Sequence, residues 1–523
     1  MKTRILTFIS AVTLFSVLSI PVRLTPMAQA DEQHHRHYKV IDLGTFGGPN
    51  SYSNLMSTVG EAKVIAVGQA DTSDSVFPNT NPYNCFDPYV MNAFKWEDGV
   101  RVNLHSLNDD ENCSEASGIS ASGIFVGDSE NGAVDPLTGF KELRAVVWKY
   151  GKIMGLGTFG GNHSAALSIN DRGQTIGWAL NDIPDPYSLF DLPILSSSNG
   201  TQTRAFLWQD GEMQDLRTLG GPDAEPFFIN NRGSIAGFSY TNSTPNPVTG
   251  LPTLHPFLWH KGEMKDLGTL GGFGTPFSTV SVNGLNNRGQ VIGLSPLAGD
   301  QMADPFLWDR ARLIDLATQG TGGTFLSANA LNDAGEIVGV AAFPGRVFDA
   351  SLWRDGVVTD LGTVGADGCS EAHALNSEGQ IVGKSESCDF STARAFLWEN
   401  GSMIDLNTVV PPGTLLRLGE ANFINDQGVI AGQGGLPNGD QHSFLLIPVC
   451  EDDTEGCADA SVDQRAMIHS GAAPDTQAQP TRAVLGPTAV TPGSPAAREM
   501  MARIHAGPTR RFQVPGLATP RAR

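Results

Sequence analysis

Eight imperfect copies of one module run through most of this chain, and no other feature limits its fold as strongly. Each copy combines a short apolar segment, Asn-x-x-Gly, a segment ending in Gly, a variable stretch, Ala-Phe-Leu-Trp or a variant, and Asp-Leu-Gly-Thr or a variant. The Ala-Phe-Leu-Trp segments stand at residues 93–96, 145–148, 205–208, 256–259, 305–308, 351–353, 395–398 and, without the Trp, 443–446. A repeat of 45 to 60 residues indicates a propeller or another stacked-repeat fold.

Each module holds four strand-like segments, a to d in chain order, which in the third copy are residues 165–169, 174–178, 204–208 and 212–216. β-Branched and aromatic residues fill these segments, and Gly and Asn separate them. Four antiparallel strands form one blade, which buries its apolar faces only by stacking on other blades. The sequence predicts an all-β propeller of eight four-stranded blades, with recurrent Phe and Trp packed between the sheets. Seven blades, with one degenerate copy outside the ring, is the alternative.

The two ends of the repeat region complement each other. The last copy supplies three strands, up to residues 444–447, and lacks the fourth. Residues 38–44 have the pattern of a fourth strand without a blade of its own. We expect this N-terminal strand to insert into the final blade, which closes the ring and removes its open edge. The propeller then spans residues 38–448.

A triplet at the start of several Phe-containing segments resembles the His-Ala-Phe motif of the bacterial extracellular repeat family with HAF repeats. The triplets are Arg204-Ala205-Phe206, Arg394-Ala395-Phe396, His255-Pro256-Phe257 and His442-Ser443-Phe444. The resemblance covers roughly residues 38–448 and implies an exported protein, with no settled biochemical activity. Because Arg often stands where the motif has His, the motif implies no histidine chemistry.

The N-terminus carries two basic residues, Lys2 and Arg4, then an apolar stretch at residues 5–20 and the triplet Ala28-Gln29-Ala30. These are the three parts of a secretory signal peptide, here residues 1–30. An uncleaved membrane anchor is the alternative, but the apolar stretch is shorter than the ~20 residues that a span needs. We therefore expect a secreted protein, extracellular or periplasmic, with a polar leader at residues 31–37 and no membrane span after cleavage.

The composition of the chain changes after the repeat region. Residues 449–523 are rich in Ala, Pro, Thr, Gly and Arg without a period, which predicts a disordered tail. The whole chain has a formal net charge of −21, and an acidic surface repels phosphate backbones and anionic lipids. We expect a monomer that binds neither nucleic acid nor membrane.

The six cysteines fall in neighbouring pairs: Cys85 and Cys113, Cys369 and Cys388, Cys450 and Cys457. In an exported chain such cysteines are expected to form disulfides. Local pairing is the simplest pattern, although the sequence leaves the connectivity open. A zinc site is the alternative, but it would need C-x₂-C spacing that this sequence lacks.

The connections between strands divide into two sets. In a four-strand meander the a-to-b and c-to-d turns lie on one face, and the d-to-a and b-to-c connections lie on the other. The first set is tight, whereas the length variation and four cysteines fall in the second set. Variable loops on a rigid scaffold often carry binding, so the loop-rich face is the predicted working face. Its candidate ligand-binding residues, for a glycan or a protein, are Tyr83, Tyr89, Tyr187, Phe190 and Tyr240. The alternative is that these aromatics pack the loops onto the ring.

Two recurring polar positions have structural explanations. The Asn-x-x-Gly segments offer fewer oxygens than calcium requires, so hairpin turns are predicted at Asn170, Asn230, Asn286, Asn332, Asn376 and Asn425. One Asp per blade precedes Leu, which predicts a repeated structural hydrogen bond at Asp215, Asp266, Asp315, Asp360 and Asp405.

No catalytic motif is visible, and we name no catalytic residue, metal ligand or cofactor. Glu115 and Glu371 share the string Cys-Ser-Glu-Ala, and paired acids serve glycosidases, but the two residues belong to blades 2 and 7. Two hypotheses remain: a secreted, non-catalytic binding or scaffold protein, and a carbohydrate-active propeller enzyme, either a hydrolase or a lyase. The residues favour binding. Carboxylates gathered around the central channel would favour the enzyme.

Overall fold

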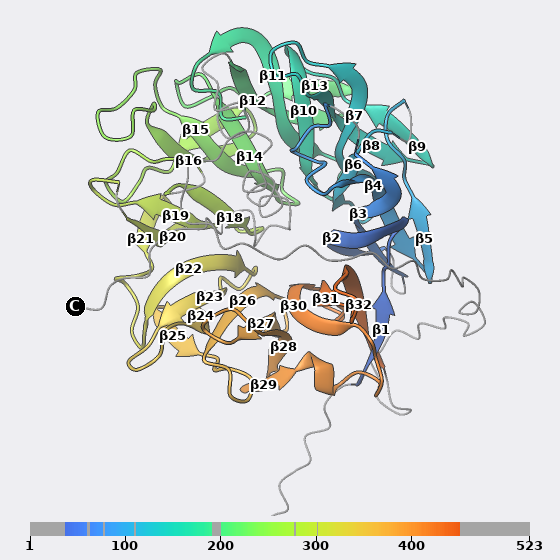
Figure 1. Ribbon diagram of the computed structural model, residues 1–523. Helices are drawn as coiled ribbons and strands as arrows, with labels where there is room; N and C mark the ends of the chain where they lie inside the picture. The colour runs from blue at the N-terminus through green and yellow to red at the C-terminus, as the bar shows by residue number, and fades with distance from the viewer. Residues whose placement is uncertain are drawn as a thin grey trace, which may run out of the picture. The chain divides into compact units, whose positions relative to one another are not determined.

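The computed structural model describes residues 37–59, 63–76, 79–108, 111–190, 200–276, 279–300 and 302–449. In these ranges the chain forms eight antiparallel four-stranded sheets, the blades of a propeller (Figure 1). The predicted all-β, eight-bladed fold is therefore confirmed, and the seven-bladed alternative is wrong. The predicted signal peptide, the leader up to residue 36 and the tail from residue 450 lie outside the described residues.

The first four blades follow chain order from strand a to strand d. Blade 1 consists of β2 (Gly47–Val59), β3 (Lys63–Ser75), β4 (Tyr89–Glu97) and β5 (Val100–Asn103). Blade 2 consists of β6 (Ser114–Ile119), β7 (Phe125–Val134), β8 (Lys141–Lys149) and β9 (Lys152–Gly155). Blade 3 consists of β10 (Gly160–Ile169), β11 (Thr175–Asp185), β12 (Gly200–Gln209) and β13 (Glu212–Asp215). Blade 4 consists of β14 (Ala224–Ile229), β15 (Ile235–Tyr240), β16 (Leu254–His260) and β17 (Glu263–Asp266).

The next three blades repeat this order, and the eighth borrows its last strand from the N-terminal side. Blade 5 consists of β18 (Ser281–Leu285), β19 (Val291–Pro296), β20 (Ala303–Asp309) and β21 (Arg312–Asp315). Blade 6 consists of β22 (Thr324–Leu331), β23 (Ile337–Ala342), β24 (Asp349–Arg354) and β25 (Val357–Asp360). Blade 7 consists of β26 (Cys369–Leu375), β27 (Ile381–Glu386), β28 (Ala393–Glu399) and β29 (Ser402–Asp405), followed by the 3-10 turn η1 (Leu406–Thr408). Blade 8 consists of β30 (Arg417–Ile424), β31 (Ile430–Gly435), β32 (Gln441–Val449) and β1 (His37–Asp42).

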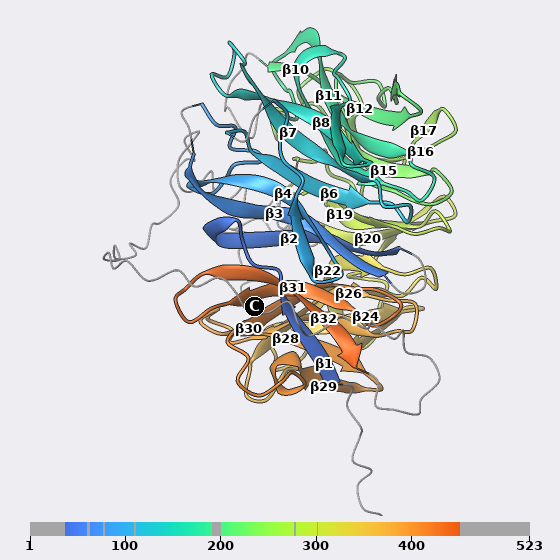
Figure 2. The same cartoon turned by 90° about the vertical axis from the view of Figure 1, so that its right-hand side faces the viewer.

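The ring closes between its two ends, as the sequence predicts. β1 pairs antiparallel with β32, from His37 opposite Val449 to Asp42 opposite Phe444 (Figure 2). The first strand of each blade contacts the first strand of the next, and β2 also contacts β30, so these strands line the centre. Hydrogen bonding of β1 to β32 covers the edge of β32, and β1 takes the outermost position that strand d has in the other blades.

The Asn-x-x-Gly segments are the predicted hairpin turns. At Asn170 the backbone amide donates to the Gln174 carbonyl at 3.0 Å, and the Gly173 amide donates back to the Asn170 carbonyl at 2.9 Å. Gly173 has φ of 74°, a left-handed conformation that glycine adopts without strain. The neighbouring strands run further than expected. β11 extends to Asp185, which pairs with Gly200 beyond an irregularity. The connection between the predicted strands at residues 174–178 and 204–208 is therefore shorter than expected.

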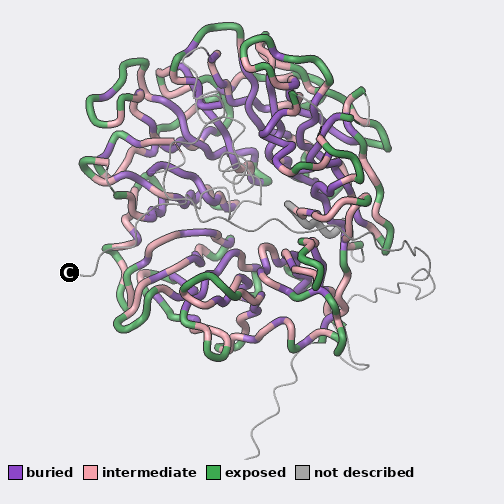
Figure 3. Tube along the Cα trace, viewed as in Figure 1, coloured by how far each residue is buried: buried purple, intermediate pink, exposed green. Residues whose placement is uncertain are grey.

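The core lies between blades rather than within them. Phe206 of blade 3 packs with Val126 and Val147 of blade 2, and Phe257 of blade 4 packs with Ile176 of blade 3. Buried residues follow the sheets, and exposed ones gather at the loop tips (Figure 3). Burial of one such Phe side chain contributes roughly 1.5–3 kcal/mol. The recurrent aromatics therefore act as the predicted wedges between sheets.

Candidate functional site

Strand direction assigns every connection to one of two faces. The a-to-b and c-to-d connections form the tight-turn face, and the b-to-c and d-to-a connections form the loop-rich face. Long connections on the loop-rich face follow β3, β11 and β15. The loop-rich face therefore has most of the chain that does not belong to sheets.

Two disulfides anchor loops on this face. Cys85, in the b-to-c loop of blade 1, is bonded to Cys113 just before β6. Cys388, in the b-to-c loop of blade 7, is bonded to Cys369 at the start of β26. Local pairing is thus confirmed for these four cysteines, whereas Cys450 and Cys457 lie outside the described residues. Disulfides of this kind suggest an oxidising, non-cytoplasmic location.

The predicted ligand-binding aromatics lie mainly in a packed cluster. Tyr83, Phe190 and Tyr240 are buried and Tyr187 is half-buried within one hydrophobic cluster. The Tyr83 ring meets Trp178 of β11 edge-on at 5.5 Å between centroids, and Phe190 lies 4.2 Å from Trp178. Tyr89 is half-buried at the start of β4. In this structure the buried rings hold the long loops of blades 1 and 3 to the ring, and ligand binding by the five residues stays a prediction.

A buried histidine and a buried aspartate hold the b-to-c loop of blade 2. His163 Nε2 lies 3.0 Å from Asp135 Oδ2, and His163 Nδ1 accepts from the Leu143 amide at 3.1 Å. Burial alone would raise the pKa of Asp135, but hydrogen bonds from His163, the Leu137 amide and Asn162 lower it well below its usual range. Both ring nitrogens of His163 and the Asp135 carboxylate therefore make hydrogen bonds within the protein, and these bonds fix the b-to-c loop of blade 2.

One aromatic on this face is exposed instead. Phe390, at the tip of the b-to-c loop of blade 7, is 66% exposed and has φ of 61°. Left-handed backbone costs a residue with a bulky side chain about 1–2 kcal/mol, and such strain persists only where the surroundings enforce it. Here the Phe390 amide donates to the Ser387 carbonyl at 2.7 Å, and Cys388 lies within the same loop.

The loop around Phe390 is also organised by Asp389. The Ser387 hydroxyl donates to Asp389 Oδ1 at 2.7 Å and the Ser391 amide donates to it at 3.0 Å. These bonds lower the pKa of Asp389 to about 2, so the carboxylate is ionised at neutral pH. Phe390 stacks on Phe348 of the blade 6 loop at 6.4 Å between centroids, next to Val347, which is 57% exposed. These three apolar residues form the 347/390 patch.

Other exposed apolar side chains follow the same face. Nine of the large exposed hydrophobic residues lie in or beside its connections, and they come from blades 2 to 8: Val134, Leu137, Ile183, Val248, Phe273, Met302, Val347, Phe390 and Leu415. The other exposed ones lie on outer strands, at the end of β32 or, for Tyr150, in a c-to-d turn. Sequence reasoning missed Phe390, although a Phe two residues after a loop cysteine, Cys388, is a signal that could have found it.

A charged cluster occupies the inner strands of blades 7 and 8. Lys384 Nζ lies 3.5 Å from Glu371 Oε2 and 3.2 Å from Glu386 Oε2. Burial alone would lower the pKa of Lys384, but the charges of Glu371, Glu386 and Glu420 outweigh burial and raise it. The three carboxylates therefore surround one ammonium, an arrangement that joins the two blades. Glu115 lies on β6 of blade 2, as predicted, and not with this cluster.

The repeated Asp residues make the predicted hydrogen bond. In each of them the side-chain Oδ1 accepts from the backbone amide two residues later, at 2.7 to 2.9 Å. The residues are Asp215, Asp266, Asp315, Asp360 and Asp405. The first residue of the His-Ala-Phe-like triplets reaches the same Asp from strand c. Arg204 Nη2 lies 3.0 Å from Asp215, and His255 Nδ1 lies 2.9 Å from Asp266. Either basic side chain serves this cross-strand contact, which explains why Arg and His alternate.

The described residues can also be searched for metal-binding clusters and for membrane-spanning helices. No group of three or more His, Cys, Asp or Glu there is placed to hold a metal ion. No helix in that part of the chain is both long enough and apolar enough to cross a membrane.

Comparisons with known proteins give no family. No family model matches the sequence, and no curated protein matches it. Among solved structures, TolB from Acinetobacter baumannii is 10% identical with a TM-score of 0.29, over 75% of this chain and 65% of TolB. Porphyromonas gingivalis dipeptidyl peptidase 4 is 10% identical with a TM-score of 0.40, over 73% of this chain and 57% of that enzyme. Trypanosoma rangeli sialidase in complex with the inhibitor DANA is 8% identical with a TM-score of 0.32, over 79% of this chain and 58% of the sialidase. The chain thus spans less than two thirds of each of these proteins, and likenesses this distant carry no argument about activity.

Proposed function

We propose that this chain is a secreted, non-catalytic binding protein of the HAF-repeat type, and that its loop-rich face binds a glycan. The carrying observation is Phe390, an exposed aromatic held in a strained left-handed conformation on a disulfide-anchored loop. An exposed aromatic with this backbone also occurs in an ordinary turn, at Tyr150. What supports a role in recognition at Phe390 is the combination of this backbone with the disulfide-anchored loop and the stack on Phe348.

The chemistry of the tip suits a sugar ring. Phe390 and Phe348 offer an aromatic face, and the ionised Asp389 with the hydroxyls of Ser387 and Ser391 lies directly beside it. Sugars combine apolar faces with several hydroxyls, so recognition sites pair aromatic surface with a few fixed polar groups. Because the loop is already ordered by its own hydrogen bonds, binding costs less conformational entropy.

A glycan array of bacterial and host saccharides, probed with the labelled full-length protein, tests the proposal. We expect saturable binding by the natural protein and its loss in Phe390→Asn, since Asn removes the aromatic face while tolerating the left-handed backbone. The matched control is Tyr150→Asn. Tyr150 is 91% exposed with φ of 54°, but lies in a c-to-d turn on the tight-turn face, so its substitution should leave glycan binding unchanged.

The outcomes separate the proposal from its rivals. Equal binding by Phe390→Asn and the natural protein would remove the 347/390 patch from the site. If the natural protein bound no glycan on the array, this result would refute a glycan ligand and favour a protein partner on the same face.

A carbohydrate-active enzyme is the second candidate, because carboxylates do gather on the inner strands of blades 7 and 8. Their side chains are largely buried and face Lys384, as structural acids do. Product release from array glycans that is lost in Glu371→Gln, with the melting temperature unchanged, would establish the enzyme instead.

A further inference from the structure

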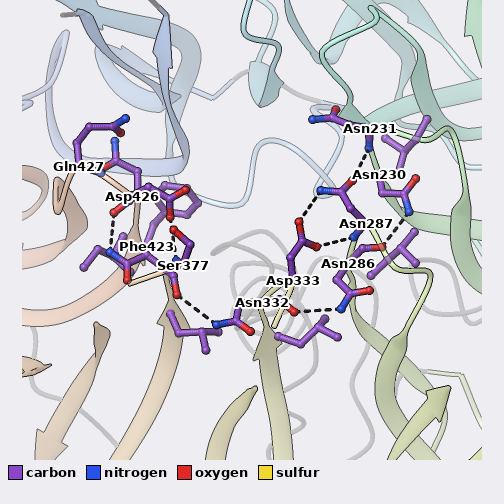
Figure 4. A pocket seen from close by; sticks show the side chains of 17 residues that line it. Asn230, Asn231, Asn286, Asn287, Asn332, Asp333, Ser377, Phe423, Asp426 and Gln427 are labelled. Carbon is purple, nitrogen blue, oxygen red and sulfur yellow. Dashed lines mark hydrogen bonds between the residues drawn. The ribbon is translucent and has the colours of Figure 1, made fainter. Parts of the chain in front are cut away.

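The tight-turn face contains a cavity of about 550 Å³ where the a-to-b turns of blades 4 to 8 converge (Figure 4). Its floor is apolar and includes Leu285, Leu331, Leu375 and Phe423, which are only half-buried. Its rim is formed by turn residues, mainly asparagines together with Asp333 and Asp426. The volume is in the range of small-ligand and side-chain pockets, which pair apolar walls with a few polar groups.

Most turn asparagines on this rim are already used within the ring. The side-chain amide of Asn230 donates to the Asn286 carbonyl at 2.9 Å, and that of Asn286 donates to the Asn332 carbonyl at 3.0 Å. The series ends at Asn425, whose side-chain NH₂ is buried and has no partner among the described residues. Both Asp333 oxygens accept from Asn287, at 2.7 and 2.9 Å, and Asp426 Oδ1 accepts from the Ser377 amide at 2.9 Å. The two carboxylates are nevertheless exposed, and each oxygen can accept a further hydrogen bond. An occupant should therefore bring cations for the carboxylates and a carbonyl oxygen for the Asn425 NH₂.

The charge of the rim is one-sided. No Lys or Arg is among the described residues that line the cavity, whereas Asp333 and Asp426 are exposed there. The turn arginines of blades 3 and 5 are not among the lining residues. The guanidinium of Arg172 lies against Gly233, and that of Arg288 lies against Gly335, in the turn that carries Asp333. An anionic ligand is disfavoured, and a guanidinium is a fitting partner for exposed carboxylates.

The chain itself contains a segment of that chemistry. Residues 500–523 include five arginines and no acidic residue, and they place Arg510 and Arg511 directly before Phe512. β32, being a strand c, ends at Val449 on the tight-turn face, the face that has the cavity. About 60 residues separate Val449 from Arg510, and a flexible chain of that length spans on the order of 40 Å, enough to cross a propeller face.

We propose that the segment 500–523 of the same chain docks into this cavity, with Arg510 and Arg511 on the Asp333 and Asp426 carboxylates and Phe512 on the apolar floor. A photo-crosslinking amino acid in place of Phe512 in the full chain tests it. We expect an intramolecular adduct at residues 423–427 or 331–333, with a yield that falls several-fold in 1 M salt, because salt screens exposed charges.

A charge-matched pair of variants sharpens the test. In Asp333→Asn with Asp426→Asn we expect the adduct yield to fall several-fold. In Asp210→Asn with Asp355→Asn, which remove the same charge from exposed c-to-d turns of the same face, the yield should hold. Melting temperatures show whether each variant is folded. Adducts elsewhere on the ring, adducts only between two molecules, or equal yields in both double variants would overturn the proposal.

Discussion

Substitution of Asn230 by Asp tests whether the turn asparagines hold the blades together. The Asn230 side chain is buried, accepts from the Arg232 and Ser234 amides at 3.0 and 2.9 Å, and donates to the Asn286 carbonyl of the next blade. Asp keeps the acceptor for the two amides but places an oxygen against the Asn286 carbonyl. Loss of that donor beside a buried acceptor costs about 1–3 kcal/mol, which lowers the melting temperature of a large domain by a few degrees.

The same exchange at Asn425 is the control. Asn425 accepts from the Gln427 and Val429 amides in the same way, but its NH₂ has no partner among the described residues. We expect Asn425→Asp to lose clearly less stability than Asn230→Asp, because no hydrogen bond to a neighbouring blade is lost there.

The pH dependence of Asn230→Asp gives a second signature. Burial beside a carbonyl raises the pKa of the introduced carboxyl group in the folded state, and its protonated form can donate to the Asn286 carbonyl. The loss of stability should therefore be present at pH 7.5 and shrink at pH 5. Urea and thermal unfolding, followed by Trp fluorescence, measure the stability of both variants at the two pH values. Equal losses of stability in the two variants, or a pH-independent loss for Asn230→Asp, would refute the idea that the turn asparagines hold neighbouring blades together.

Three further outcomes are expected. Cys369→Ser with Cys388→Ser should lower stability by up to about 3 kcal/mol, from the loop entropy of a crosslink of this span, as measured by urea unfolding. Burial beside Asp87 raises the pKa of Asp71 to about 8, whereas the unfolded chain ionises near pH 4, so stability should fall as the pH rises between these values, and Asp71→Asn should flatten that slope. Phe390→Asn should raise the melting temperature slightly, because the strained backbone is relieved; a lower melting temperature would show that Phe390 supports the fold.

The repeat pattern predicted the architecture well, because each copy contains all the local signals of a blade. Gly173 and the other turn glycines mark the hairpins, and the recurrent Phe residues mark the faces between sheets. The missing fourth strand of the last copy even predicted how β1 closes the ring. These features depend on short segments and on their period, both of which a single sequence displays.

The functional surface was less accessible to sequence reasoning. Tyr83 and Phe190 stand in long loops and carry the expected chemistry, but they turn inward because Trp178 of β11 offers both an apolar partner. Phe390 stands in a short loop, and its exposure follows from the backbone angle that its loop imposes. The cavity at the turns depends on five blades converging, which no single repeat encodes. Side-chain direction and convergence are set by tertiary packing, so spacing alone does not reveal them.

The pairing of β1 with β32 also determines which step of folding comes last. Asp42 and His442, in contact across that junction, are 400 residues apart in the chain. The chain is synthesised from its N-terminus, so β1 is the first strand to leave the ribosome. Its partner β32 is the last strand to do so, and β1 has no pairing partner until then. Until then a strand with unsatisfied backbone groups stays open to wrong pairing, and pairings this distant are slow to form. Ring closure should therefore be the late, rate-limiting event of maturation, and mistakes at that step should appear as strand exchange between neighbouring molecules.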